Sequence, residues 1–133
     1  MKEYQFTVRV RYAETDQMGV VYHGNYAQYF EMGRVEWLRN IGVSYKWMEE
    51  NGIMLPVVSL TMNYKKPARY DDLLRVKTIF RSQTSVKIDF DYEIYNEKDE
   101  LLTTAYSILV FVDMKTGKPS IPPAYLKEKL EQL

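Results

Sequence analysis

The sequence predicts an α+β fold in which a five-stranded antiparallel sheet curves round one long helix. Three observations predict it: strand-like alternation near the N-terminus, one stretch with helical spacing over residues 25–40, and four further alternating stretches after residue 56. A helix of about 16 residues is about 24 Å long, whereas a strand of ten residues reaches about 33 Å. The strands are therefore long enough to bend round the helix.

The first strand is predicted from an alternation of large apolar residues with polar ones, which is typical of a strand with one buried face. Its apolar positions are Tyr4, Phe6, Val8, Val10 and Tyr12. Glu14-Thr15-Asp16 then predicts a turn, so Tyr12 is expected to continue the packed face of this strand.

The long helix is predicted over residues 25–40, where apolar residues recur at three- and four-residue spacings. Asn25 and Gln28 fit a capping box at its start, and Gly42 ends it. Gly33 costs about 1 kcal/mol against alanine inside a helix, which we interpret as a sign that helix and sheet approach closely there. A shorter helix, capped by Ser44, is expected to run through Glu50.

The later strands are predicted over residues 58–64, 74–81, 86–94 and 101–112, and a short helix from residue 124 to the end. The segment 86–94 has one charged face. The segment 101–112 is apolar on both faces, which is typical of a central strand or of one that meets another subunit. A sheet this apolar has an edge to cover, so we expect a homodimer or homotetramer.

Composition excludes several kinds of chemistry. The chain has no cysteine, so it has no thiol nucleophile and no cysteine-based metal site. It has one histidine and no GxSxG serine hydrolase motif. Neither a metal nor a cofactor is therefore expected. The charges balance at 18 basic and 18 acidic residues, which indicates neither nucleic acid nor a membrane surface as partner. No apolar run approaches the length of a membrane span. We expect one cytoplasmic domain over residues 1–133.

Residues 13–26 contain an acid, an apolar run, the histidine and a helix start in the order AETDQMGVVYHGNY. These are the parts that thioester hydrolysis needs. A thioester releases a thiolate, whose conjugate acid has a pKa of about 8.5, so it needs no strong general acid. Asp16 is placed to act as general base or as nucleophile. Backbone amides at the helix start are placed to polarise the carbonyl.

The stretch RYAETDQMGVVYHGNYAQYFEMGRVEWLR, residues 11–39, resembles the signature of the hotdog-fold acyl-CoA thioesterases of the 4-hydroxybenzoyl-CoA thioesterase type. The resemblance extends to NYKKPARYDDLLRV and TAYSILVFVD and covers nearly the whole chain. It implies hydrolysis of acyl-CoA, with Asp16 as the catalytic acid, the His23 amide as the carbonyl donor and a site at a subunit interface. Gly33 lies at a position where members of this family often have alanine. Met18 replaces a smaller residue, which bears on the shape of the acyl pocket.

Further substrate-binding residues follow from the motif and the resemblance. Val21 and Tyr22 belong to the apolar slot, and Tyr12 is implied at the border of the pocket, although strand packing is the alternative. Coenzyme A carries phosphates, so its nucleotide end needs basic groups. The cluster of Lys65, Lys66 and Arg69 is the candidate, with solubility and edge protection as the alternative.

Each candidate also has a structural interpretation. Asp16 fits an Asx turn, the His23 side chain fits a structural group at a helix start, and Asn25 fits a cap rather than a substrate ligand. Glu31 and Glu36 lie on the helix, where another hotdog branch has its acid. A solvated or ion-paired helix face is the favoured interpretation of both here, because Asp16 already matches the resembled branch.

Two other functions stay open: a hotdog hydratase or dehydratase, and a non-catalytic acyl-CoA-binding protein. The sequence also leaves open the acyl group, coenzyme A or acyl carrier protein as thiol carrier, and the role of Asp16 as base or nucleophile.

Overall fold

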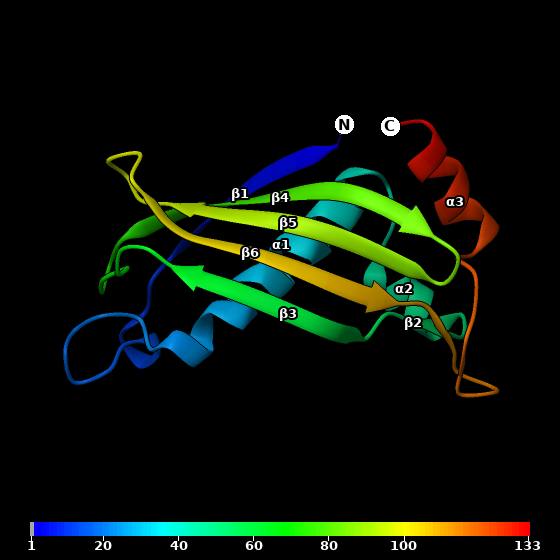
Figure 1. The fold of residues 1–133 in the computed structure, drawn as a ribbon, viewed down its shortest axis with the longest axis horizontal. Coiled ribbons are helices and arrows are strands. Elements are labelled where there is room, and N and C mark those ends of the chain that lie inside the picture. Colours follow the sequence, from blue (N-terminus) through cyan, green and yellow to red (C-terminus); the bar gives the residue numbers. More distant parts are fainter. Residues whose placement is uncertain (1) are drawn as a thin grey trace.

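The computed structural model describes residues 2–133 and has a five-stranded antiparallel sheet wrapped across one long helix (Figure 1). The strand order is β1-β4-β5-β6-β3, so the N-terminal strand and β3 form the two edges. The strands of this sheet are β1 (Glu3–Arg9), β3 (Val57–Tyr64), β4 (Leu73–Thr84), β5 (Lys87–Tyr95) and β6 (Leu101–Val110). The predicted α+β hotdog architecture is confirmed.

The helices are α1 (Tyr26–Asn40), α2 (Tyr45–Glu50) and α3 (Ala124–Glu131). Helix α1 crosses one face of the sheet, and α3 lies at the end where β4 and β5 meet (Figure 1). The short strands β2 (Ile53–Met54), β7 (Val112–Asp113) and β8 (Lys118–Pro119) form a second, three-stranded sheet. Sequence patterns did not predict it, because two residues are too few for an alternation to be recognised. No helix of the described chain is long and apolar enough to cross a bilayer.

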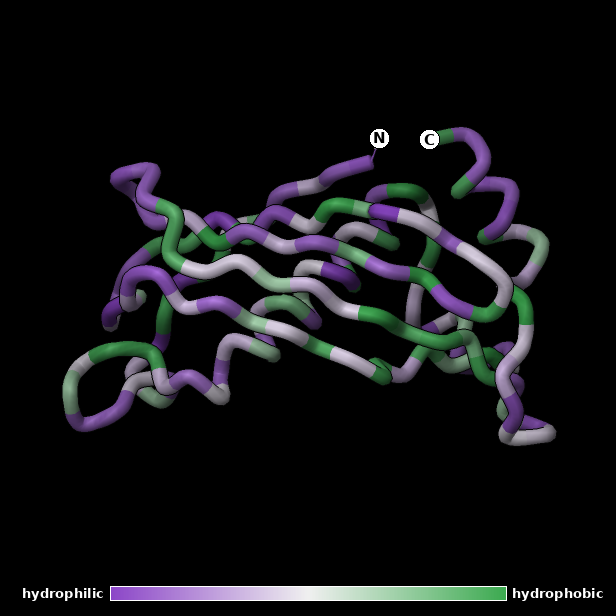
Figure 2. The backbone as a smooth tube through the Cα atoms, viewed as in Figure 1, coloured by the Kyte–Doolittle hydropathy of each residue, from purple (hydrophilic) through white to green (hydrophobic). Residues whose placement is uncertain are grey.

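The predicted apolar face of α1 forms the centre of the core. Its buried residues are Tyr26, Tyr29, Phe30, Gly33, Trp37 and Leu38. Phe30 packs on Tyr92 at 4.8 Å between ring centroids, and Trp37 packs on Phe90 at 5.1 Å. Burial of each such side chain contributes about 1.5–3 kcal/mol to folding. Strand hydropathy alternates along the tube in Figure 2, as the period-two patterns predict.

Gly33 lies where the helix approaches the sheet most closely. A Cβ atom at this position would lie 2.5 Å from Thr78 Oγ1 and 3.2 Å from Val76 Cγ1. Only glycine leaves room for this packing, so the interpretation of Gly33 from sequence is confirmed.

The prediction that the first strand continues to Tyr12 is wrong. Strand β1 ends at Arg9, and residues Tyr12–Glu14 form a 3₁₀ turn. Tyr12 is 78% exposed and makes an edge contact with Tyr70. The chain turns because the Glu14 amide donates to the Arg11 carbonyl at 3.0 Å, while the Glu14 carboxylate accepts from the Arg11 amide at 2.9 Å.

The two helix-start predictions have different outcomes. Ser44 caps α2 as predicted, accepting a hydrogen bond from the Trp47 amide at 3.2 Å. The capping box at Asn25 is wrong, because this residue has helical backbone angles and makes no side-chain cap bond. A 3₁₀ turn over His23–Asn25 precedes α1 instead, and the Asn25 side chain donates to the Glu14 carbonyl at 2.8 Å.

Candidate active site

The candidate site is the Asp16 pocket, an open hollow of about 330 Å³ between the loop after the Tyr12–Glu14 turn, the start of α1 and the end of β3. In Figure 1 the loop lies at the lower left, and its apolar stretch is green in Figure 2. The predicted residues that line this pocket are Asp16, Val21, His23, Lys65 and Lys66. Residues separated by more than 40 positions are therefore brought to one surface.

The loop is shaped by hydrogen bonds around Asp16. Its amide donates to the Val20 carbonyl at 2.9 Å, and its carbonyl accepts from the Gly19 amide at 3.0 Å. Gly19 has a positive φ of 77°, which suits glycine. Asp16 Oδ1 accepts from the Met18 amide at 2.8 Å, which is the Asx turn. Within residues 2–133, Oδ2 accepts no hydrogen bond, and the side chain is exposed.

The loop is fastened to the rest of the fold at its second end. Val21 donates through its amide to the Ala68 carbonyl at 2.8 Å, and Val20 forms an isolated bridge with Arg69. Tyr22 donates through its amide to the Glu14 carbonyl at 3.0 Å. The loop thus closes on itself directly before the 3₁₀ turn that leads into α1.

His23 is the first residue of that 3₁₀ turn. Its amide has no hydrogen-bond partner within the described chain, as expected for an N–H at the start of a helical segment. Its carbonyl accepts from the Tyr64 hydroxyl at 3.2 Å. The imidazole packs against the Tyr22 ring at 4.3 Å and meets the Tyr64 ring edge-on at 6.4 Å. The backbone amide is therefore free to donate, while the ring packs against aromatic neighbours.

The remaining predicted residues lie outside the Asp16 pocket. Tyr12 and Tyr22 are exposed nearby, and Asn25 is occupied by its bond to Glu14. Arg69 lines the adjacent hollow, which shares Lys66 with the Asp16 pocket. Lys66 forms an ion pair with Glu100 at 2.8 Å, and this pair lowers the pKa of Glu100.

Four lining residues were not predicted as site residues: Val20, Tyr26, Tyr64 and Pro67. Tyr64 and Pro67 flank the two predicted lysines, and Tyr26 belongs to the predicted apolar helix face, so the signal for them was present in the sequence. Burial is the main effect that raises the pKa of Tyr26. Its hydroxyl accepts a hydrogen bond from the Ala68 amide at 3.3 Å.

Glu14 was also missed. It is 4% exposed, and its carboxylate accepts bonds from the Arg11 guanidinium at 3.0 Å and from the Tyr29 hydroxyl at 2.8 Å. Burial opposes its ionisation, but the Arg11 amide, the Tyr29 hydroxyl and the Arg11 guanidinium together hold its pKa below the ordinary value. Burial and this carboxylate raise the pKa of Tyr29. The only sequence signal is the Arg11–Glu14 spacing, since Tyr29 is reached through the fold.

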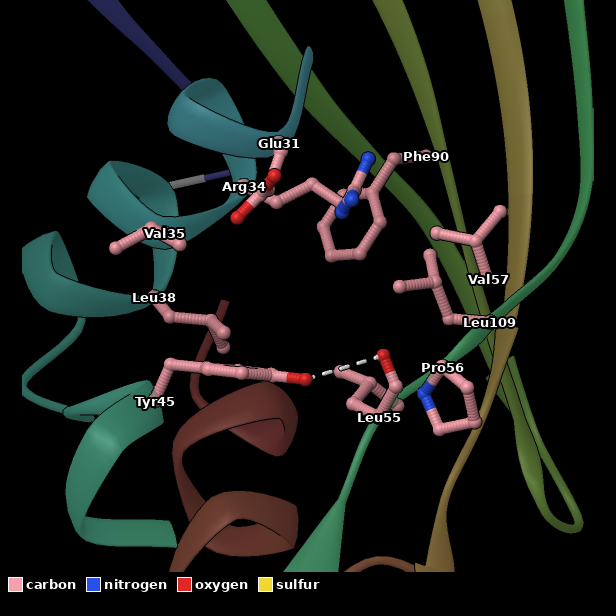
Figure 3. Close-up of a pocket in the computed structure, with 10 residues that line it drawn as sticks. All are labelled: Glu31, Arg34, Val35, Leu38, Tyr45, Leu55, Pro56, Val57, Phe90 and Leu109. Atoms are coloured by element: carbon pink, nitrogen blue, oxygen red, sulfur yellow. Dashed lines mark hydrogen bonds between the residues drawn. The ribbon is translucent and has the colours of Figure 1, made fainter. Parts of the chain in front are cut away.

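A second cavity, of about 210 Å³, lies between α1, α2 and the start of β3 (Figure 3). Glu31 and Arg34 border it from α1, and the Tyr45 hydroxyl donates to the Leu55 carbonyl across its floor at 3.4 Å. Glu36 forms an ion pair with Arg39. Of the two helix acids, Glu31 is therefore the one beside a cavity. No cluster of three His, Asp or Glu residues within residues 2–133 is arranged for a metal ion.

Comparisons with known proteins agree along nearly the whole chain. A family model described as the thioesterase-like superfamily matches residues 10–130. The acyl-CoA thioester hydrolase YbgC of Escherichia coli is 33% identical over 129 residues, covering 97% of this chain and 96% of that protein. YneP of Bacillus subtilis, provisionally named an acyl-CoA thioesterase, is 41% identical over 112 residues, 84% of this chain and 81% of that protein. The DHNA-CoA thioesterase from Staphylococcus aureus superposes with a TM-score of 0.95 and 38% identity, covering 99% of this chain and 91% of that one.

Proposed function

The chain belongs to the thioesterase-like superfamily, and from this premise we propose that it hydrolyses acyl-CoA thioesters with Asp16 as the catalytic carboxylate and the His23 amide as the carbonyl donor. The resemblance to the hotdog acyl-CoA thioesterases is confirmed, and the chain is an acyl-CoA thioesterase. The residue roles, the assembly and the single domain of residues 1–133 are part of the proposal.

One observation carries the mechanism. The Asp16 carboxylate and the start of the His23–Asn25 turn open onto the same pocket, and the His23 amide has no partner within the described chain. A nucleophile or base and an oxyanion donor are the two groups that a thioester needs, because the thiolate leaves without strong acid assistance.

Asp16 acts in one of two ways. As a general base it takes a proton from water, which attacks the carbonyl carbon and expels the coenzyme A thiolate. As a nucleophile its oxygen attacks the carbonyl carbon, the thiolate leaves, and water then cleaves the mixed anhydride. After a single turnover in H₂¹⁸O, ¹⁸O in the Asp16 carboxylate identifies the anhydride route with water attacking the aspartyl carbon, because the general-base route leaves that carboxylate unlabelled.

The His23 amide stabilises the oxyanion that forms on the thioester oxygen. Such a donor contributes a factor of about 10²–10³ to the rate, since it is oriented before the reaction begins. The amide is held by its turn, and the Tyr64 hydroxyl bonds the carbonyl of the same residue at 3.2 Å.

Lys65 and Lys66 border the Asp16 pocket, and Arg69 lies in the adjoining hollow, which supports a path for the phosphates of coenzyme A along this side. Loss of the Lys65 charge is expected to raise KM more than it lowers kcat, because phosphate contacts form in the ground state as well as in the transition state.

We propose that a second copy of the chain covers the edge strand β3. Val57 and Val58 on this strand are exposed, and an open apolar edge is a site of strand pairing. A homodimer or homotetramer follows, and the cavity beside Glu31 lies next to the covered edge.

The test of the mechanism is thiol release from short, medium, long and aromatic acyl-CoAs by the wild type and Asp16→Asn. The chain has no cysteine, so a colorimetric disulfide reagent reports only the product. Asp16→Asn is expected to abolish turnover with fold and oligomer unchanged, while Glu31→Gln, the matched control on α1, retains it. Near wild-type turnover in Asp16→Asn would refute the assignment, and loss in Glu31→Gln alone would move the acid to α1.

The alternatives have their own readouts in the same assay. Enoyl absorbance without thiol release identifies a hydratase or dehydratase. Tight acyl-CoA binding without thiol release identifies a binding protein, and turnover only of acyl-carrier-protein thioesters identifies the other thiol carrier.

A further inference from the structure

We infer that Glu14 is a positioning residue that holds the Asp16 loop and the His23 amide in a fixed relation, an inference that rests on the proposed roles of those two groups. Glu14 lies two residues before Asp16 and is the one buried charged residue among residues 2–133. An ionised carboxylate is costly to bury unless its oxygens are satisfied, and here both are.

The side chain connects the loop to helix α1. Oε1 accepts from the Arg11 amide at 2.9 Å and from the Tyr29 hydroxyl at 2.8 Å. Oε2 accepts from Nε of the Arg11 guanidinium at 3.0 Å and forms an ion pair with Nη2 of the same group at 2.9 Å. Tyr29 is fully buried on α1. One carboxylate thus ties the chain before the loop to the second turn of the helix.

The main chain of Glu14 connects the same two parts again. Its carbonyl accepts from the Tyr22 amide at 3.0 Å and from the Asn25 side chain at 2.8 Å. Tyr22 directly precedes His23, and Asn25 ends the turn that His23 begins. The position of the His23 amide relative to Asp16 is therefore set by bonds that meet at one residue.

The chemistry of the partners requires a carboxylate here. The two anionic oxygens accept three hydrogen bonds from Arg11 and Tyr29 and form an ion pair with the Arg11 guanidinium. In Glu14→Gln an NH₂ group replaces one of the two oxygens. That group faces either the Arg11 guanidinium or the Arg11 amide and Tyr29 hydroxyl, so donors that the carboxylate satisfied lose their acceptor. The isosteric variant keeps the volume and loses the positioning.

Displacement of a reacting group by about 1 Å costs about 100-fold in rate. Glu14 is not among the residues that line the Asp16 pocket, so its loss is expected to act on the reaction rather than on substrate contacts. We expect kcat of Glu14→Gln to fall about 10- to 100-fold with KM changed less than about threefold. Tyr29→Phe removes one of the three hydrogen bonds to the carboxylate and is expected to lower kcat less, in the same direction.

The experiment measures kcat and KM for thiol release from acyl-CoA by wild type, Glu14→Gln and Tyr29→Phe, below the melting transition of each. Tyr92→Phe is the matched control: it also removes a buried tyrosine hydroxyl, which bonds Ser107 at 2.6 Å on the sheet and accepts from the Arg34 guanidinium of α1 at 3.2 Å. Equal losses of kcat in Tyr29→Phe and Tyr92→Phe would overturn the inference, since destabilisation alone would then explain both. Wild-type kcat in Glu14→Gln would overturn it as well.

Amide hydrogen exchange supplies a readout that needs no turnover. Glu14→Gln is expected to lose protection at the Gly19, Val21 and Tyr22 amides, with protection of the β5 and β6 amides unchanged. Retained protection of the loop would overturn the inference even if no acyl-CoA were hydrolysed. Wild type inactive on every thioester would refute the proposed function instead, so the two failures are distinguishable.

Discussion

Gly33→Ala tests the closest approach between helix and sheet. In an exposed helix this change stabilises by about 1 kcal/mol, because alanine has the higher helix propensity. Here the new Cβ atom lies 2.5 Å from Thr78 Oγ1 and 3.2 Å from Val76 Cγ1, which is too close for the first contact and tight for the second. Overpacking of this kind costs about 1–3 kcal/mol.

The clash is expected to exceed the propensity gain. Thr78 lies on β4, which is paired with β1 on one side and β5 on the other, so its backbone has little freedom to withdraw. Subtracting the propensity gain of about 1 kcal/mol from the overpacking cost leaves an expected net loss of up to about 2 kcal/mol of unfolding free energy. For a chain of this size that corresponds to a fall in Tm of about 4 °C for each kcal/mol.

The assay is chemical and thermal unfolding of Gly33→Ala, Thr78→Ala and the double variant. Thr78 Oγ1 has no hydrogen-bond partner among residues 2–133, so its removal is expected to break no bond. With that atom gone, the alanine at position 33 is expected to recover most of its propensity gain. The double-mutant cycle should then give a coupling equal to the relieved overpacking cost, about 1–3 kcal/mol.

The sign of the change in unfolding free energy tests whether helix and sheet approach closely at Gly33. A Gly33→Ala variant more stable than wild type would refute the close approach, and so would a destabilisation that persists unchanged in the Thr78→Ala background.

Three further predictions concern stability at low pH, the loop that contains Asp16 and the edge strand β3. Because the folded state lowers the pKa of Glu14 from its ordinary 4.5, its ionisation stabilises the protein above that pH, and this stabilisation is lost as pH falls through the folded pKa. The free energy of unfolding should therefore fall less steeply with acid in Glu14→Gln than in the wild type. Parallel curves for the two proteins would contradict this prediction. Gly19→Ala puts a side chain at φ 77° and should cost about 1–2 kcal/mol and lower kcat; unchanged stability by urea unfolding would count against the loop geometry. Val58→Lys should weaken self-association in analytical ultracentrifugation, whereas Gln5→Lys on the opposite edge strand should not; equal dissociation would disfavour the β3 interface.

Local patterns predicted the elements well where the signal lies within a few residues. The buried face of α1, the strand alternation and the Ser44 cap all depend on neighbours along the chain. The errors arose where distant partners compete with local preference. Tyr12 leaves the strand because Glu14 bends the chain, and Asn25 leaves the cap position to bond the Glu14 carbonyl.

The same division applies to the candidate site. The order of acid, apolar run, histidine and helix start is a sequence property, and it indicated Asp16 and His23 as site residues. The structure has Lys65 and Lys66, which were proposed separately as phosphate ligands, lining the same pocket. Glu14 was not predicted, because its importance comes from Tyr29, fifteen residues away and brought near by α1.

The sequence by itself determined the α+β class, the helix face and the thioesterase motif, since spacing and residue type are local and each turn or strand repeats them. Only the tertiary structure decided the strand order β1-β4-β5-β6-β3, the exposed edge at β3 and the bonds that meet at Glu14. These depend on which distant groups can satisfy buried donors and acceptors at the same time, and that is a property of the folded chain as a whole.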